Sequence, residues 1–180
     1  GQDLELMMRD YNATDGRIVL SREKLPLEQL PYLYSMADCT INISDAEGFG
    51  LGTLESLSCE TPIIVNMTGG LQEQVTDGEE WFGVGIEPAS KAIIGSQDVP
   101  YIYEDRISKE DFISALHKMY SMSEEENREL GKKGSEHVHK NYNFKDFENK
   151  WIELMDDIQK NLGSWDTRKD YKAWEVKEIA

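Results

Sequence analysis

The sequence is poor in cysteine and has no long apolar run. Only two of the 180 residues are cysteines, Cys39 and Cys59, and neither forms a CxxC pair or has a histidine close by. This pattern argues against a disulfide framework or a zinc site and favours a reducing compartment. No apolar run approaches the ~20 residues of a membrane span, and the first residues show no signal-peptide pattern. We therefore expect a cytoplasmic protein without a membrane span.

Positive charge is also scarce. The chain has 19 Lys and Arg against 35 Asp and Glu, which gives a formal net charge of −16 at pH 7. A field of this sign repels phosphate backbones and anionic lipids, so we expect no nucleic acid or membrane partner. The apolar fraction of 39% argues against disorder. The length is typical of one domain and suffices to bury roughly 70% of the unfolded surface.

Apolar runs alternate with segments of helical periodicity in the first half of the chain. The runs predict strands at residues 17–20, 40–43, 62–65 and 83–86. The periodic segments predict helices at 27–37, 51–58 and 70–75. This alternation predicts an α/β fold, with a Rossmann-like parallel sheet, right-handed crossovers and helices on both faces.

The second half of the chain has a different pattern. Residues 88–107 break the alternation and are interpreted as a long loop. Helical periodicity then predicts helices at 108–120, 123–140 and 144–158. We divide the chain into a Rossmann-like domain, 1–162, and a tail or interdomain helix, 163–180. The aromatic residues of the tail either pack on this domain or belong to an interface; they are Trp165, Tyr171 and Trp174.

The segment that carries most chemical information is 45–55, D-A-E-G-F-G-L-G-T-L-E. It connects a predicted strand to a predicted helix, at the carboxyl end of the sheet, where open α/β sheets bind ligands. Its glycines let the backbone approach a ligand closely. The free N–H groups at the start of the helix favour an anion such as phosphate.

Two glutamates flank this glycine-rich segment. Glu47 stands just ahead of the helix, and Glu55 lies one turn inside it with its side chain leaning toward the helix start. A carboxylate in contact with phosphate would repel it, so each glutamate is expected to bind neutral hydroxyls beside the phosphates. Such charge-assisted hydrogen bonds contribute roughly 1.5–3 kcal/mol each. A pocket that binds a sugar on one side of the phosphates and a ribose on the other would fit a nucleoside diphosphate sugar.

Four stretches resemble the donor half of retaining glycosyltransferases with the GT-B architecture, of the family-4 type. They are 33–38 (LYSMAD), 47–51 (EGFGL), 55–64 (ESLSCETPII) and 69–73 (GGLQE). The signature of that family is two glutamates with seven residues between them, as Glu47 and Glu55 have. The resemblance covers about residues 17–160. It implies one half of a GT-B fold and a hexosyltransferase that retains the configuration of the anomeric carbon.

The resemblance also implies roles for individual residues. Glu47 would be the catalytic residue that holds donor-sugar hydroxyls near the reacting carbon, and Glu55 would bind the ribose diol. Backbone N–H groups would bind the sugar and diphosphate at Gly48, Phe49, Gly50 and Leu51. Three residues would lie near the base, namely Ser21, Arg22 and Lys24. The resemblance implies no metal and no other cofactor, and an acceptor that is a sugar, a lipid or a protein.

The chain departs from the family pattern in ways that keep alternatives open. No strand followed by Arg and Lys precedes Arg17, and the N-terminal Rossmann-like domain that would bind the acceptor is absent from this sequence. We therefore expect an incomplete donor domain that is inactive alone. A non-catalytic module that binds a nucleotide sugar is one alternative. A Rossmann-like sugar-nucleotide epimerase is another, but it needs a histidine in the cleft, and we expect surface positions for His117, His137 and His139.

Overall fold

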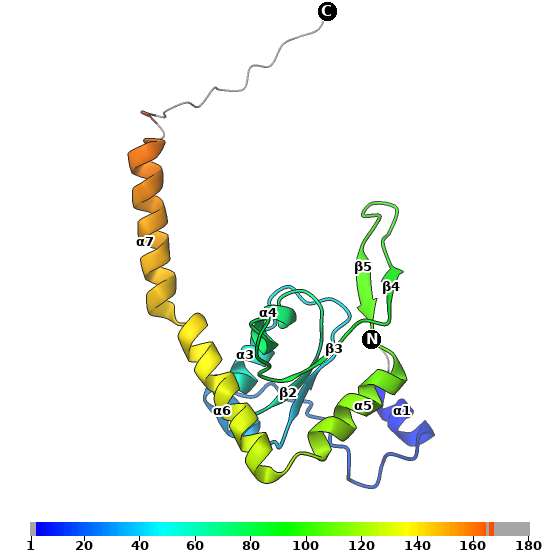
Figure 1. Cartoon of the computed structure of the whole chain (residues 1–180). Coiled ribbons are helices and arrows are strands. Elements are labelled where there is room, and N and C mark those ends of the chain that lie inside the picture. The colour runs from blue at the N-terminus through cyan, green and yellow to red at the C-terminus, as the bar shows by residue number, and fades with distance from the viewer. Residues whose placement is uncertain (1–2, 165, 168–180) are drawn as a thin grey trace, which may run out of the picture.

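The computed structural model describes residues 3–164 and 166–167. Its centre is a three-stranded parallel sheet in the order β1-β2-β3 (Figure 1). The strands are β1 (Thr40–Asn42), β2 (Ile63–Asn66) and β3 (Val84–Ile86). Each forms within one or two residues of a predicted strand.

All four residues of β2 are buried because helices cover both faces of this sheet. Ile63 and Val65 pack against helices α3 (Leu51–Ser58), α4 (Leu71–Val75) and α6 (Glu124–Asn141) through Leu57, Leu71, Val75 and Val138. Ile64 points to the other face, where Val84, Ile86 and two residues of α5 (Lys109–Tyr120), Ala115 and Met119, surround it. Successive side chains of a strand point to opposite faces, so two apolar cores share one strand. The predicted fold class is confirmed.

The C-terminal part is helical, as predicted. Helices α5, α6 and α7 (Phe144–Asn161) begin after the caps Ser108, Ser123 and Asn143. Ser123 and Glu126 form a reciprocal capping box, and hydrogen bonds from the Ser123 backbone and hydroxyl lower the pKa of Glu126. All 18 residues of α7 are exposed, and this helix projects away from the sheet (Figure 1).

Two elements near the N-terminus differ from the predictions. The predicted strand at 17–20 is wrong, since Val19 is 85% exposed and no strand among the described residues pairs with this segment. A β-branched run forms a strand only where another strand can pair with it. The predicted helix at 27–37 is a 3-10 turn, η1 (Leu27–Gln29), followed by α2 (Leu30–Ser35). A further helix, α1 (Leu4–Asp10), forms in a segment where none is predicted.

The segment 88–107 is not the predicted loop. It contains an antiparallel hairpin of β4 (Ser90–Ile93) and β5 (Tyr103–Arg106), with Ser90 opposite Arg106. The hairpin stands out beyond the carboxyl end of β3 (Figure 1). Its strands carry charges without clear alternation, so the pattern has no strand signal, and the pairing becomes evident only in three dimensions.

The predicted division at residue 162 stays a prediction, and the tail aromatics Trp165, Tyr171 and Trp174 lie outside the described residues. Within 3–164 and 166–167, no helix has the length and apolarity that crossing a bilayer requires.

Candidate functional site

The connections after all three parallel strands meet at one edge of the sheet. Residues 47–50, here called the glycine loop, follow β1 and lead into α3. Gly69 and Gly70 follow β2, and the β4–β5 hairpin follows β3. Ligands of open α/β sheets bind at this edge, and the structure places the glycine loop there, as the sequence predicts.

The glycine loop packs its carbonyl groups against the Gly69–Gly70 turn. A Cβ atom on Gly69 would overlap the carbonyl oxygen of Glu47. A Cβ on Gly70 would lie 2.7 Å from the Phe49 oxygen and 2.9 Å from the Gly48 oxygen. In a trans peptide the N–H points opposite to the C=O, so the next N–H groups along the chain point away from this turn.

These N–H groups are free to bind a ligand. Among the described residues, no acceptor receives a hydrogen bond from the N–H of Gly48, Phe49, Gly50, Leu51 or Gly52. Gly50 is the N-cap of α3 and has φ +85°, a conformation that glycine adopts without strain. The positive end of the α3 dipole adds to the field of these groups, so the site favours an anion.

The two glutamates flank the loop in different environments. Glu47 is half-buried, whereas Glu55 is exposed on α3 and its Oε2 accepts a hydrogen bond of 2.9 Å from the Tyr34 hydroxyl. Burial and this hydrogen bond raise the pKa of Tyr34 to about 12. The described residues give neither carboxylate a cationic partner. Both carboxylates therefore keep their capacity to accept hydrogen bonds from a ligand.

A cavity of about 340 Å³ adjoins Glu55. Its wall is mostly apolar and is formed by Leu27, Leu30, Pro31, Tyr34, Leu51, Leu54, Glu55, Ser58, Cys59, Val138 and Tyr142. The Tyr142 ring also packs edge-on against Phe49, with 6.3 Å between the ring centroids. Tyr142 thus connects the wall of the cavity to the glycine loop. Cys59 is a free thiol whose pKa is raised by burial, which disfavours its nucleophilic form.

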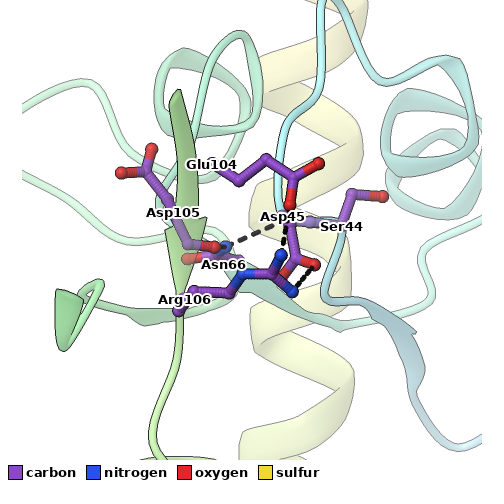
Figure 2. A network of polar contacts seen from close by, with 6 residues as sticks. All are labelled: Ser44, Asp45, Asn66, Glu104, Asp105 and Arg106. Atoms are coloured by element: carbon purple, nitrogen blue, oxygen red, sulfur yellow. Dashed lines mark hydrogen bonds and ion pairs between the residues drawn. The ribbon is translucent and has the colours of Figure 1, made fainter. Parts of the chain in front are cut away.

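A polar network fixes the residues that precede the glycine loop (Figure 2). Buried Asn66, at the end of β2, donates through Nδ2 to the carbonyl oxygens of Ser44 (2.9 Å) and Asp105 (3.1 Å). The Asp105 N–H donates to the Asp45 carbonyl at 2.7 Å. The network ties the base of the hairpin to the chain just before Glu47.

Arg106 completes this network. Its guanidinium lies 2.5 Å from Oδ2 of Asp45 and also pairs with Glu104, as Figure 2 shows. Sequence reasoning missed both Asn66 and Arg106. A polar residue at the end of a buried strand was an available signal for Asn66, whereas Arg106 lies in the segment interpreted as a loop.

The three residues predicted to lie near the base make no contact with the glycine loop among the described hydrogen bonds and ion pairs. Ser21 donates to the Glu23 carbonyl, Arg22 pairs with Glu5 of α1, and Lys24 is exposed. No hydrogen bond or ion pair between described residues joins these three to the glycine loop. Their role near the base stays a prediction.

One of the three histidines is not at the surface. His117 and His139 are exposed, but the surface prediction is wrong for His137, which is 9% exposed. Its ring stacks on Phe82 at 4.1 Å between centroids, and Nε2 lies 3.3 Å from the Glu73 carbonyl oxygen. The reason is that Phe82 and the α4 backbone at Glu73 cover this side of α6.

Within residues 3–164 and 166–167, acidic, histidine and cysteine side chains do not gather around a common point. In the part of the chain that the structure describes, no three of them are arranged to hold a metal ion.

A parallel sheet with helices on both faces and a loop of free N–H groups at its edge defines a Rossmann-like domain. Residues 2–137 match the family described as Glycosyl transferases group 1, and the chain belongs to this family.

Curated relatives match parts of the chain. It is 37% identical over 90 residues to D-inositol 3-phosphate glycosyltransferase of Acidothermus cellulolyticus, a match that covers 49% of this chain and 20% of the relative. It is 43% identical over 53 residues to O-antigen chain mannosyltransferase B of Escherichia coli, which covers 29% of this chain and 14% of the relative. The chain thus spans a fifth or less of the length of these two relatives.

Solved structures share the fold. Sucrose-phosphate synthase of Thermosynechococcus elongatus superposes with a TM-score of 0.67 at 24% identity, over 86% of this chain and 33% of that one. The C-terminal domain of LpcC, a group 1 glycosyl transferase of Francisella tularensis, superposes with a TM-score of 0.57 at 20% identity, over 78% and 61%. These neighbours have the GT-B architecture, and one half of it is the fold of this chain.

Proposed function

We propose that this chain is the donor-binding domain of a retaining hexosyltransferase of the family-4 type. Its donor is a nucleoside diphosphate sugar, and its acceptor is a sugar, a lipid or a protein bound by an N-terminal Rossmann-like domain. The observation that supports this best is the row of free N–H groups from Gly48 to Gly52, which lies between Glu47 and Glu55 in the chain. Membership of the glycosyltransferase group 1 family supports the reaction class.

The chemistry follows from this assignment. N–H groups at the helix start stabilise the negative charge that develops on the departing diphosphate. Glu47 binds hydroxyls of the donor sugar and orients a transition state with oxocarbenium character. Glu55 binds the ribose diol. We assign no general base, and an oxygen of the leaving phosphate accepts the proton of the acceptor hydroxyl.

A binding experiment should distinguish the roles of the two glutamates. Calorimetry with UDP and GDP, and with UDP- and GDP-sugars, measures affinity for each part of the donor. We expect Glu55→Ala to weaken binding of the nucleoside diphosphate itself. We expect Glu47→Ala to weaken binding of the intact nucleotide sugar and to leave the nucleoside diphosphate almost unaffected.

The control is Glu136→Ala, which removes an exposed carboxylate of α6. An equal loss for both glutamate variants with both ligands would contradict the assigned roles. Binding without release of nucleoside diphosphate, when the chain is joined to its acceptor domain and given an acceptor extract, would support a non-catalytic binding module instead.

A further inference from the structure

A buried glutamine lies directly behind the glycine loop. Gln74, the fourth residue of α4, is 1% exposed and sits among core residues of that helix such as Leu71 and Val75. Its Nε2 donates to the carbonyl oxygen of Phe49. Its Oε1 is buried without a hydrogen-bond partner among the described residues. A leucine would fill this position without burying an unpaired polar atom, so packing alone does not explain an amide here.

The hydrogen bond from Gln74 determines how the Phe49–Gly50 peptide is turned. A carbonyl oxygen can only accept, so the amide nitrogen of Gln74 must face Phe49. The N–H of Gly50 belongs to the same trans peptide and points the opposite way, away from Gln74.

The hydrogen bond from Gln74 adds to the close packing of the Phe49 carbonyl against Gly70. Gly50 has φ +85°, and a glycine adopts positive and negative φ about equally well. Rotation of the peptide would turn the Gly50 N–H inward and present a carbonyl oxygen to the ligand. A carbonyl dipole repels an anion where an N–H attracts it.

We propose that Gln74 is a positioning residue that locks the Phe49–Gly50 peptide with its N–H directed at the donor diphosphate. The ligand part of this inference rests on the proposed function, whereas the orientation of the peptide does not. Gln72 provides the contrast within α4, since it is exposed and its Nε2 donates to the Gly69 carbonyl at 3.3 Å.

The first experiment compares Gln74→Met with Gln72→Met. Methionine keeps the approximate volume of glutamine and removes the N–H donor. We expect Gln74→Met to raise the dissociation constant for UDP or GDP at least fivefold and Gln72→Met to change it less than twofold. Circular dichroism and thermal unfolding show whether each variant is folded. Folded Gln74→Met with the affinity of the original chain would overturn the proposal.

A second variant separates hydrogen bonding from packing. In Gln74→Glu, a protonated carboxyl can donate to Phe49, whereas an ionised carboxylate repels that oxygen. Affinity for UDP or GDP, relative to the original chain at the same pH, should therefore fall as pH rises and the introduced carboxyl ionises. A ratio that stays constant from pH 5.5 to 8.5 contradicts a hydrogen-bonding role.

A third measurement does not depend on any ligand. Residual dipolar couplings report the direction of the Gly50 N–H bond, which should change in Gln74→Met and stay the same in Gln72→Met. If the original chain binds neither UDP nor GDP but the couplings change as expected, the proposed function fails and the positioning role stands. Unchanged couplings in Gln74→Met would refute the positioning role itself.

Discussion

The Tyr34 hydroxyl donates a hydrogen bond of 2.9 Å to Oε2 of Glu55 and so links α2 to the helix that follows the glycine loop. Gly52 lies beside this contact, and a Cβ there would be in ordinary van der Waals contact with the hydroxyl oxygen, at 3.6 Å. The hydrogen bond restricts the Glu55 side chain on the wall of the cavity. An orientation set before ligand binding reduces the entropy that binding must overcome.

Ionisation of Tyr34 should reduce stability at high pH. Its pKa is about 12 in the folded chain against 10.0 for a free tyrosine, since burial and the Glu55 hydrogen bond favour the neutral hydroxyl. The unfolded chain therefore loses this proton first, and the stabilisation, complete below pH 10, is lost as pH rises toward 12. Urea unfolding at pH 9, 10 and 11 should show a steeper decline for the original chain than for Tyr34→Phe. Tyr32→Phe, which alters a 73% exposed ring, should follow the original chain; parallel declines for all three would contradict this account.

The elements that could be predicted from sequence are those whose signals are local. β2 is a continuous apolar run before which a Thr-Pro pair ends a helix, and α6 begins with a serine and three glutamates. The strand at 17–20 and the β4–β5 hairpin show the limit of such signals. A strand depends on a partner that can be far away in the chain, so local pattern overestimates one segment and misses the other.

For the candidate site, too, the local features were predictable from the sequence and the long-range contacts were not. The spacing of glycines and glutamates placed a ligand loop between β1 and α3, but not the direction of its peptides. That direction depends on Gly69, Gly70 and Gln74, which lie about 20 residues further along the chain and meet the loop only after β2 has formed. Burial of His137 likewise depends on Phe82 and α4 packing against α6, tertiary contacts that helical periodicity does not reveal.

Gly70 should tolerate no side chain. Its Cβ would lie 2.7 Å from the Phe49 carbonyl oxygen, a backbone atom that cannot move without shifting the glycine loop. We expect Gly70→Ala to destabilise the fold by about 1–3 kcal/mol and to weaken nucleoside diphosphate binding. Gly48→Ala is the control, since nothing lies within 4 Å of its added Cβ, and its stability should change by less than about 0.5 kcal/mol. Denaturant unfolding gives both values, and equal losses would show that steric contact is not the cause.

Asn66 should be intolerant of a carboxylate. In Asn66→Asp the shape is kept, but a charged acceptor replaces the amide that donates to the Ser44 and Asp105 carbonyl oxygens. Because this residue is fully buried, we expect a loss of about 3 kcal/mol or more in the free energy of unfolding at pH 7. Asn149→Asp is the matched change at an exposed position of α7, and it should alter stability by less than about 0.5 kcal/mol. Similar unfolding midpoints for the two variants would count against the network as a structural support.

The pairing of Arg106 with Asp45 should contribute more to ligand binding than to stability. The two side chains are 43% and 39% exposed, so solvent limits their coupling to about 0.5–1 kcal/mol. A double-mutant cycle of Arg106→Gln and Asp45→Asn, followed by urea unfolding, measures this energy. The same substitutions should weaken nucleotide-sugar binding by more than this stability loss explains, because they release the chain just before Glu47. The cycle at Lys145 and Glu148, an exposed pair on α7, is the control and should leave binding unchanged. If the substitutions at Arg106 and Asp45 reduce stability but leave nucleotide-sugar affinity intact, the hairpin supports the fold alone and does not position Glu47.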